Sequence, residues 1–331
     1  MLMVQYKTQN TPFKFPFTTA HGLKTHQPAL LLRIQSGPFS GMGEAPAIHY
    51  YPETVDSMIA SLEKGMPILR RYAFTEPDRF WHFCHHLFPG ETFLQCALDM
   101  AYWNMYAMAK RQSIRELWGL RNDAEGPMTD YTLGLDTPEK VIEKMKAMPW
   151  PIYKVKVASR SDMSILRKLR QETEAVLRID ANAAWSYDDA VALLPELEAL
   201  QIELIEQPLA KDNWEGMKAL KLISKIPLIA DEACVQEHDV KRCAEGFHGI
   251  NIKLTKCGGL TPARRMIEEA RQLGLQVMMG CMNETEIGSE AIAQFLPLLD
   301  YVDVDGPLLL DIPPLKTLHY EAGKVSLLKR P

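Results

Sequence analysis

The feature that most constrains this 331-residue chain is a regular alternation of short apolar runs and amphipathic stretches after about residue 128. Each run is bounded by polar or turn residues and is too short for a helix, so it predicts a buried strand. The stretches between the runs have helical spacing, as at Ala263, Met266 and Ile267. The predicted strands are residues 131–133, 153–157, 176–179, 202–205, 228–230, 250–254, 276–279 and 301–304.

Eight strands that alternate with about seven helices indicate a parallel sheet. Successive strand ends lie 24, 26, 25 and 22 residues apart, counted along Lys156, Asp180, Glu206, Asp231 and Lys253. One strand, one helix and two short loops need about this much chain. A closed (β/α)8-type barrel is the natural arrangement, although periodicity alone also allows an open, doubly wound sheet. Too little chain follows residue 307 for a full unit, so we expect a missing or short eighth helix.

The first 120 or so residues follow a different pattern. Two apolar runs, 30–34 and 41–45, surround a Ser-Gly-Pro turn, which is typical of a hairpin. Leu94, Leu98 and Ala101 then recur at helical spacing. We therefore expect an α/β protein in which an α+β domain over residues 1–125 precedes a barrel over residues 126–307. The tail, at about 308–331, is expected to return to the first domain and complete it.

Charge and cysteine content argue against several classes of function. The chain has 42 acidic and 37 basic residues, a net charge of -5 and no basic block, so nucleic acids and membranes are unsupported as partners. The sequence has no apolar stretch of about 18 residues, and its first residues lack the apolar core of a signal peptide. The six cysteines are scattered without a CxxC pair, which favours free thiols and a cytoplasmic location.

Three consecutive predicted strands end in a carboxylate, namely Asp180, Glu206 and Asp231. The carboxyl ends of barrel strands share one rim, where active sites lie. Three carboxylates on that rim would repel one another unless a cation neutralised them. Oxygen ligands suit a hard cation, and Mg²⁺ can fill its remaining positions with water and substrate. The spacing therefore predicts a magnesium site.

Lysines flank these acids in the sequence. Lys154 and Lys156 are two residues apart on one strand, so both side chains point to the same face. Lys253 follows the acids, and the curvature of a barrel would place it across the mouth from Lys156. A desolvated lysine beside another cation has a lowered pKa, which suits a general base. Lys256, one turn later, is expected to lie in a loop or at the start of a helix.

These residues resemble the enolase superfamily, in its muconate-lactonizing subgroup. The resemblance implies an α+β capping domain over a (β/α)7β barrel, with the active site at the strand C-termini and one Mg²⁺ per subunit on the three acids. It rests on Lys154-Val155-Lys156, the three acids, Ile252-Lys253-Leu254-Thr255-Lys256-Cys257-Gly258-Gly259, Gly41-Met42-Gly43-Glu44 and Ala97-Leu98-Asp99-Met100-Ala101.

The implied reaction removes a proton next to a substrate carboxylate. The resulting ene-diolate carries two negative charges, which a divalent cation and Lys154 stabilise, with Lys156 or Lys253 as the base. Two lysines on opposite faces allow deprotonation on one side and reprotonation on the other, which inverts the stereocentre. A single base would suffice for a syn elimination.

The last predicted strand favours one substrate class. Asp303 and Asp305 share a face and look like the Asp-x-Asp pattern of dipeptide epimerases, which binds the free α-ammonium of a dipeptide. By the same resemblance, Thr132, Cys281 and Lys154 contact the substrate. The expected activity is thus a Mg²⁺-dependent dipeptide epimerase that inverts the α-carbon of the second residue, with L-Ala-D/L-Glu as a candidate substrate.

Three further features bear on the site. Lys24 falls in a cap loop where Ala-Glu epimerases carry an arginine, and lysine is a weaker bidentate partner for an acidic side chain. Asn182, two residues after Asp180, is expected to support the metal ligands from behind. The histidine-rich run from His82 to His86 lacks the glutamate of an HExxH motif, so a structural or surface role is expected.

Alternatives within the superfamily are an o-succinylbenzoate synthase, a cycloisomerase and an N-acylamino acid racemase, none of which needs a carboxylate pair for an ammonium group. A non-catalytic binding protein of the same fold is a more remote alternative, because every acid, base and ligand position holds a competent residue. The resemblance also implies self-association into a homo-oligomer.

Overall fold

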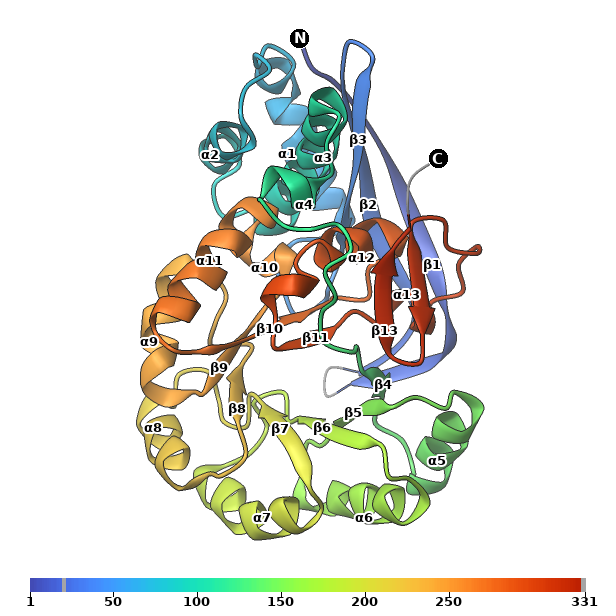
Figure 1. Ribbon diagram of the computed structural model, residues 1–331, viewed down its shortest axis with the longest axis vertical. Coiled ribbons are helices and arrows are strands. Elements are labelled where there is room, and N and C mark those ends of the chain that lie inside the picture. Colours follow the sequence, from blue (N-terminus) through green and yellow to red (C-terminus); the bar gives the residue numbers. More distant parts are fainter. Residues whose placement is uncertain (20–21, 329–331) are drawn as a thin grey trace.

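The computed structural model describes residues 1–19 and 22–328, and it consists of a cap above a barrel (Figure 1). The cap contains a three-stranded antiparallel sheet in the order β1-β2-β3. Its strands are β1 (Met3–Thr19), β2 (Gly22–Ser36) and β3 (Phe39–Pro46), and its helices are α1 (Val55–Leu69), α2 (Pro77–Leu87), α3 (Thr92–Lys110) and α4 (Ile114–Leu117). The hairpin predicted around the Ser-Gly-Pro turn is confirmed as β2 and β3.

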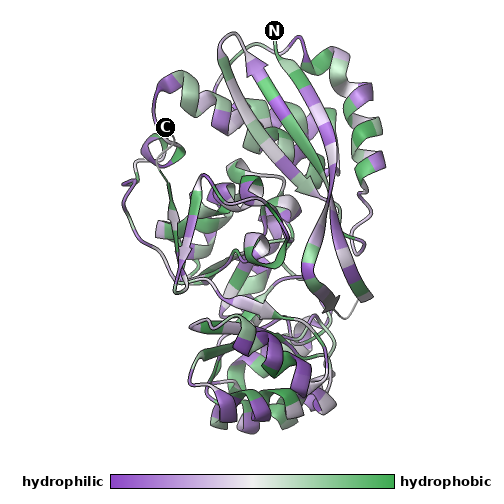
Figure 2. Ribbon diagram, turned by 90° about the vertical axis from the view of Figure 1, so that its right-hand side faces the viewer, coloured by the Kyte–Doolittle hydropathy of each residue, from purple (hydrophilic) through white to green (hydrophobic). Residues whose placement is uncertain are grey.

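Strand β1 is an element that the sequence analysis did not predict. It pairs with β2 from Met3 opposite Gln35 to Thr19 opposite Gly22, with an irregularity between Pro12 and Phe17. The two strands form a long twisted hairpin that extends from the cap toward the barrel (Figures 1 and 2). This hairpin brings residues near the start of the chain to the mouth of the barrel.

Strand β3 lies directly against helix α3 because two of its residues have no side chain. A Cβ at Gly41 would lie 2.1 Å from the carbonyl oxygen of Ala101, and a Cβ at Gly43 would lie 1.9 Å from that of Ala97. No other residue type could occupy these positions without moving the helix. The Gly-Met-Gly run therefore fixes how the cap sheet packs on α3.

The barrel is an eight-stranded parallel sheet in sequential order from β4 to β11. Its two edges approach each other through a parallel bridge between Thr129 and Val302, so the barrel is nearly closed. The eight predicted strands are confirmed, with bounds that shift by two residues or fewer. They are β4 (Tyr131–Leu133), β5 (Ile152–Lys156), β6 (Val176–Asp180), β7 (Ile202–Glu206), β8 (Leu228–Ala230), β9 (Gly249–Ile252), β10 (Gln276–Gly280) and β11 (Tyr301–Asp303).

Helices connect successive barrel strands and bury their apolar stripes against the sheet. Ala263, Met266 and Ile267 of α11 are buried, as their spacing predicts. No described helix combines the length and apolar character that crossing a bilayer requires. The barrel helices are α5 (Pro138–Ala147), α6 (Met163–Glu172), α7 (Tyr187–Ala199), α8 (Trp214–Ile223), α9 (Val240–Gly246), α10 (Leu254–Cys257), α11 (Leu260–Gln272) and α12 (Glu286–Ala293).

The chain after β11 forms only a four-residue helix, α13 (Gly306–Leu309), as expected for a short eighth helix. It then runs past the cap, where Leu310 forms a bridge with Phe13 and the backbone N–H of Asp311 donates to the carbonyl of Pro12 at 2.9 Å. A final hairpin, β12 (Leu318–Glu321) and β13 (Lys324–Leu327), follows. Leu318 of this hairpin is buried in the hydrophobic core of the barrel, so the tail contacts the cap near Pro12 and Phe13 but ends against the barrel. We propose domain limits near residues 125 and 307, with only the first part of the tail assigned to the cap.

Two buried carboxylates of the cap hold the N-terminal ends of barrel helices. Asp99 of α3 accepts hydrogen bonds from the backbone N–H and the hydroxyl of Thr261, at the start of α11. Glu44 of β3 accepts hydrogen bonds from the N–H groups of Thr285 and Gly288, around the start of α12. Both contacts satisfy helix donors that would otherwise be unpaired, and they fix the cap above the barrel mouth.

Candidate active site

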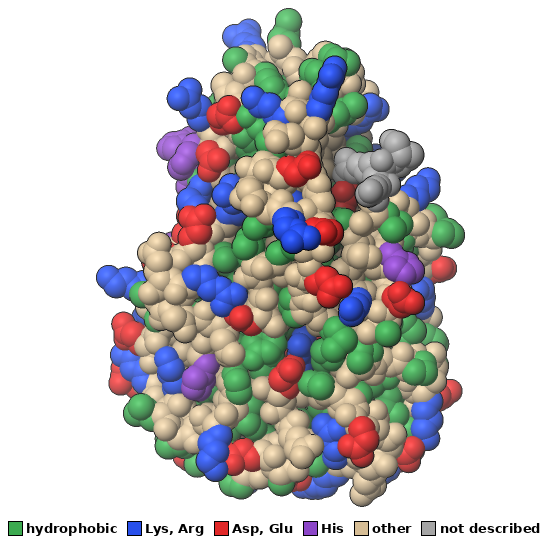
Figure 3. Space-filling model, in the orientation of Figure 1, with side chains coloured by type: hydrophobic (Ala, Val, Ile, Leu, Met, Phe, Trp, Pro, Cys, Tyr) green, Lys and Arg blue, Asp and Glu red, His purple; other side chains and the backbone are tan. Residues whose placement is uncertain are grey.

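A pocket lies at the carboxyl ends of the barrel strands, under the cap. Acidic and basic side chains are interspersed over the outer face of the molecule (Figure 3), whereas this pocket gathers both kinds in one place. A larger groove of about 950 Å³ lies on the cap between β1 and α1. The catalytic and substrate-binding residues predicted from the sequence, however, line the barrel pocket. The barrel pocket is lined by Lys24, Ile48, Tyr50, Tyr51, Thr132, Lys154, Lys156, Asn182, Asp231, Glu232, Lys253, Cys281, Met282, Asn283, Asp303 and Asp305.

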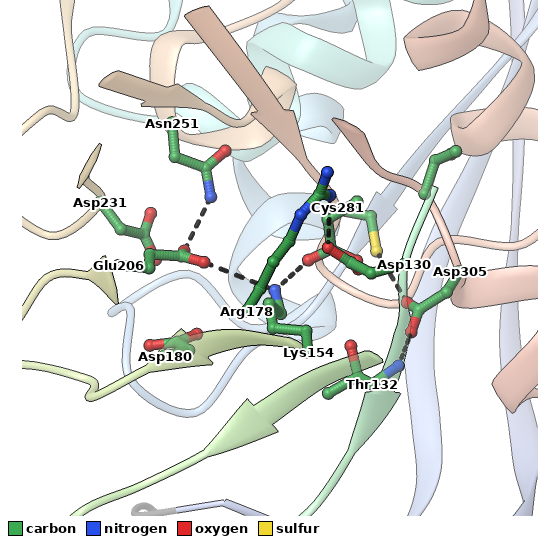
Figure 4. Close-up of polar contacts among 12 residues, drawn as sticks. Asp130, Thr132, Lys154, Arg178, Asp180, Glu206, Asp231, Asn251, Cys281 and Asp305 are labelled. Carbon is green, nitrogen blue, oxygen red and sulfur yellow. Dashed lines mark hydrogen bonds and ion pairs between the residues drawn. The ribbon is translucent and has the colours of Figure 1, made fainter. Parts of the chain in front are cut away.

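The three acids end neighbouring strands, as the sequence predicts. Asp180 is the last residue of β6 and pairs in register with Glu206, the last residue of β7, while Asp231 directly follows β8. All three side chains are buried. They lie together in Figure 4 and face the space beside Lys154.

The electrostatics of this group show uncompensated negative charge. Burial and the neighbouring carboxylates of Asp180 and Asp231 raise the pKa of Glu206 to about 7. Glu232 follows Asp231 in the chain, and burial together with the carboxylates of Asp231 and Asp180 raises its pKa to about 8. Burial would also raise the pKa of Asp231, but the ammonium groups of Lys253 and Lys256 outweigh it and hold that pKa well below its usual value.

The two candidate bases approach the acids from opposite sides. Lys156 ends β5 and Lys253 follows β9, and these strands are four positions apart in either direction around an eight-stranded barrel. Nζ of Lys156 lies 2.5 Å from Oδ2 of Asp180, and Nζ of Lys253 lies 2.6 Å from Oδ2 of Asp231. The structure therefore places an amine on each side of the carboxylate group.

The expectation of lowered lysine pKa values is wrong for Lys154 and Lys253. Burial acts to lower the pKa of each ammonium, but the adjacent carboxylates outweigh it and raise both pKa values well above normal. Lys154 is paired with Asp303, and its Nζ also lies 3.6 Å from Oε2 of Glu206. Each ammonium faces more negative charge than positive charge, which spacing alone did not show.

The second group of acids lies across the pocket from the first, with Lys154 between them (Figure 4). Oδ2 of Asp305 accepts a hydrogen bond from the backbone N–H of Thr132 at 2.6 Å, and Sγ of Cys281 lies 3.6 Å from Oδ1 of Asp305. Burial and the charge of Asp303 raise the pKa of Asp305 to about 7. The ligand atoms of Cys281, Asp303 and Asp305 all lie within 4.8 Å of one another. Four residues predicted to contact substrate thus meet at one spot.

Lys24 lies on strand β2, opposite Phe17, rather than in the predicted cap loop. The β1–β2 hairpin carries it into the pocket, because the two strands stay paired as far as Thr19 and Gly22. Burial, followed by the charges of Lys156 and Lys253, lowers the pKa of the Lys24 ammonium. Four lysines therefore line the pocket: Lys24 comes from the cap hairpin, and Lys154, Lys156 and Lys253 come from the barrel.

Two residues beside the acids were not assigned a role in the site from the sequence. Lys256 lies in the short helix α10, which agrees with the predicted loop or helix-start position, and its buried side chain contacts Asp231. Glu232 lines the pocket, and its Oε1 accepts a hydrogen bond from the side chain of Asn182 at 3.3 Å. The charge of each residue, next to a predicted ligand or base, is the only sequence signal that could have indicated it.

The histidine-rich run remains outside this site. Its three histidines lie on α2, where the ring of His85 stacks on that of Trp81 and Nδ1 of His86 lies 2.7 Å from the carbonyl oxygen of His82. These contacts agree with the structural role expected from the sequence.

The strand-end acids have the donor set that a hard divalent cation requires. Glu206 Oε2 is buried, and among the described residues it has no hydrogen-bond donor. Asp180 and Asp231 each direct one oxygen at the ammonium of a lysine, so a positive charge already lies next to each of these oxygens. Three carboxylate oxygens with this much uncompensated charge fit Mg²⁺, which binds oxygen ligands and retains water.

Comparison with known proteins gives consistent results. A family model described as "Enolase C-terminal domain-like" matches residues 138–330. An L-Ala-D/L-amino acid epimerase from Flavobacterium johnsoniae is 46% identical over 91% of this chain and 89% of its own length. A protein of the same name from a Maribacter species is 42% identical over 93% of this chain and 91% of its own length.

Solved structures agree with the sequence relatives. The L-Ala-D/L-Glu epimerase from Bacillus subtilis, in a substrate-liganded complex, superposes with a TM-score of 0.92 at 25% identity, over 99% of this chain and 96% of that one. A dipeptide epimerase from Methylococcus capsulatus, complexed with Mg and the dipeptide L-Arg-D-Lys, has a TM-score of 0.92 at 27% identity, over 99% and 97% of the two chains.

Proposed function

This chain belongs to the enolase C-terminal domain-like family, and from that premise we propose that it is a Mg²⁺-dependent dipeptide epimerase. The observation that carries the proposal is the placement of Lys156 and Lys253 on opposite strands, with the carboxylate group between them. A proton can leave a carbon toward one amine and return from the other only in such an arrangement.

We assign the two proton transfers to these lysines. A divalent cation on the three acids would offset the carboxylate charge that raises the pKa of Lys253, so that either lysine could act as the free amine. That lysine takes the α-proton of the second residue of the dipeptide, and the α-carbon becomes planar. The other lysine, as the ammonium, donates a proton to the opposite face, so the configuration inverts and total charge is conserved. In the reverse reaction the two lysines exchange roles. Well-positioned acid–base groups contribute roughly 10²–10⁴-fold each.

The three strand-end acids would hold one Mg²⁺ per subunit. Bound there, the ion would stabilise negative charge on the substrate carboxylate during proton removal. Lys154 supports the same end of the substrate, because its ammonium lies between Glu206 and Asp303 at the floor of the pocket. Asn182 supports this group through its backbone N–H, which donates to Asp180 Oδ1 at 2.9 Å.

The opposite end of the dipeptide would lie against the second group of acids. Asp303 and Asp305 are both buried, and Asp303 has an oxygen without a donor among the described residues. A free α-ammonium can donate to these oxygens, which an N-acylated substrate cannot do. Cys281 and the backbone of Thr132 fix Asp305 in place from two sides. This arrangement favours a dipeptide over the carboxylic acid substrates of the alternative activities.

Lys24 bears on the side chain of the second residue. Its ammonium is part-buried in the pocket near Lys156 and Lys253, so its charge would lie beside the substrate. An acidic second residue, as in L-Ala-D/L-Glu, would bring a compensating carboxylate. We therefore propose acidic dipeptides as the preferred substrates.

The test is incubation of the Mg²⁺-loaded protein with a library of L-Ala-Xaa dipeptides in D₂O. We expect deuterium at the α-carbon of the second residue together with inversion, fastest for the acidic members. Absence of deuterium across the whole library would refute the proposed activity. Turnover that does not favour acidic members would refute only the role assigned to Lys24.

A further inference from the structure

Each of the three candidate metal ligands has one oxygen held from behind and one oxygen that faces a lysine of the pocket. In Asp180, Oδ1 accepts the hydrogen bond from the backbone N–H of Asn182, and Oδ2 faces Lys156. The left-handed backbone of Asn182, with φ of 45°, turns this N–H back toward the carboxylate. The clamp on Asp180 is therefore part of the main chain.

Glu206 and Asp231 are clamped by side chains instead. Oε1 of Glu206 accepts a hydrogen bond from Nδ2 of Asn251 at 2.7 Å, while Oε2 has no donor among the described residues. Oδ1 of Asp231 lies 2.5 Å from Nζ of Lys256, while Oδ2 faces Lys253. In all three ligands the clamp holds the oxygen that faces away from the pocket, whereas the other oxygen faces a lysine that lines the pocket: Lys156 for Asp180, Lys154 for Glu206 and Lys253 for Asp231.

The clamping side chains differ from the catalytic lysines in their surroundings. Lys154, Lys156 and Lys253 line the pocket, whereas Asn251 and Lys256 are 0% and 1% exposed. Lys256 uses all three of its hydrogens, because Nζ also donates to the carbonyl oxygens of Asp231 at 2.6 Å and Asn251 at 3.0 Å. Lys256 thus connects the two side-chain clamps and holds them as one rigid unit.

A carboxylate with one oxygen already engaged offers a cation the other oxygen only. Three such ligands leave half of an octahedron for water and substrate, which suits Mg²⁺ with its strict six-coordinate geometry. Ca²⁺ takes six to eight oxygens and commonly binds carboxylates through both oxygens. The clamps therefore disfavour Ca²⁺ by geometry rather than by charge.

We propose that Asn251 and Lys256 are positioning residues that set the cation selectivity of this site, by keeping Glu206 and Asp231 as one-oxygen ligands. The proposal rests on the proposed function, since it takes the strand-end acids to be the Mg²⁺ ligands. It concerns these two side chains alone, because the main-chain clamp on Asp180 is insensitive to substitution.

The ratio of the Ca²⁺ and Mg²⁺ dissociation constants tests this proposal without any measurement of activity. Both ions carry the same charge, so the loss of a positive charge in Lys256→Met changes both affinities alike and cancels in the ratio. Calorimetric titration of the substrate-free protein with each ion should show that Lys256→Met and Asn251→Leu shift the ratio toward Ca²⁺, each by roughly tenfold. Asn251→Leu removes no charge, so it tests the proposal independently if Lys256→Met fails to fold.

Lys221→Met is the matched control, because Nζ of Lys221 donates to the carbonyl oxygen of Ala244 at 2.8 Å, away from the pocket. This variant should keep the wild-type ratio. Folded Lys256→Met or Asn251→Leu protein with an unchanged ratio would overturn the proposal and leave the proposed function intact. Wild-type protein that binds neither ion would overturn the metal site itself, and the selectivity proposal with it.

Discussion

The substitution Gly280→Ala tests the geometry of the active site with a single methyl group. Gly280 ends β10, beside β9, and a Cβ at this position would lie 2.8 Å from both side-chain polar atoms of Asn251 and 3.0 Å from Cε of Lys253. Carbon atoms prefer a separation of about 3.5–4.0 Å, so Cε of Lys253 must move by roughly 0.5–1 Å. The backbone of Gly280 is not left-handed, so alanine adds no strain of its own.

The expected effect is larger on catalysis than on stability. Overpacking of this kind costs about 1–3 kcal/mol of unfolding free energy, whereas a misplacement of about 1 Å at a reacting group costs about 10²-fold in rate. Lys156 lies on the other side of the barrel and is untouched. We therefore expect epimerisation to fall by about 10²-fold, while one epimer still exchanges its α-proton with solvent.

The assay follows α-proton exchange in D₂O separately from each epimer of one dipeptide, by NMR, with thermal unfolding measured alongside. Gly246→Ala is the control, because its Cβ meets only Met217 and Lys218, at 3.2 Å and beyond, and should leave both exchange rates unchanged. Unchanged exchange from both epimers of folded Gly280→Ala protein would refute the tight fit around Lys253. An equal loss from both epimers would refute a selective displacement of Lys253 and implicate the Asn251 contact instead.

Three other predictions follow from contacts in the structure. Epimerisation should fall by about 10²–10⁴-fold in each of the variants Lys156→Ala and Lys253→Ala. Each variant should still exchange the α-proton of one epimer, and the epimer should differ between the two variants. Exchange retained from the same epimer in both variants would contradict two opposed bases. Asp305→Asn should reduce kcat/KM by about 10²-fold for free dipeptides but much less for their N-acetyl derivatives, which lack the ammonium group. An equal loss for both substrates would contradict an ammonium subsite. Burial raises the pKa of Asp99 from 3.8 to about 7, although hydrogen bonds from Thr261 act to lower it. Between these two pH values the folded protein holds a proton that the unfolded protein releases. The free energy of unfolding of the wild type should therefore fall as pH rises from about 4 to about 7. Asp99→Asn should remove this pH dependence, which amounts to about 4 kcal/mol at most. The measurement is chemical unfolding of both proteins at pH 4, 5.5 and 7. If the difference in unfolding free energy between Asp99→Asn and wild type is the same at all three pH values, the reasoning is wrong.

Local periodicity determined the barrel. A strand buried on both faces must be apolar over its length, and the chain must return by a helix before the next parallel strand begins. These requirements act within about 25 residues, so the positions of Asp180, Glu206 and Asp231 at strand ends could be predicted from the sequence. The shared face of Lys154 and Lys156 followed from the two-residue repeat of a strand.

Contacts between distant segments were decided only by the tertiary structure. Strand β1 has no simple alternation, and its pairing with β2 is what carries Lys24 into the pocket. The clamp formed by Asn251 and Lys256 depends on how β9 and α10 pack behind the acids, which no spacing encodes. The raised pKa of Lys253 has the same origin, because the sum of charges around a buried group is fixed by three-dimensional distances rather than by sequence separation.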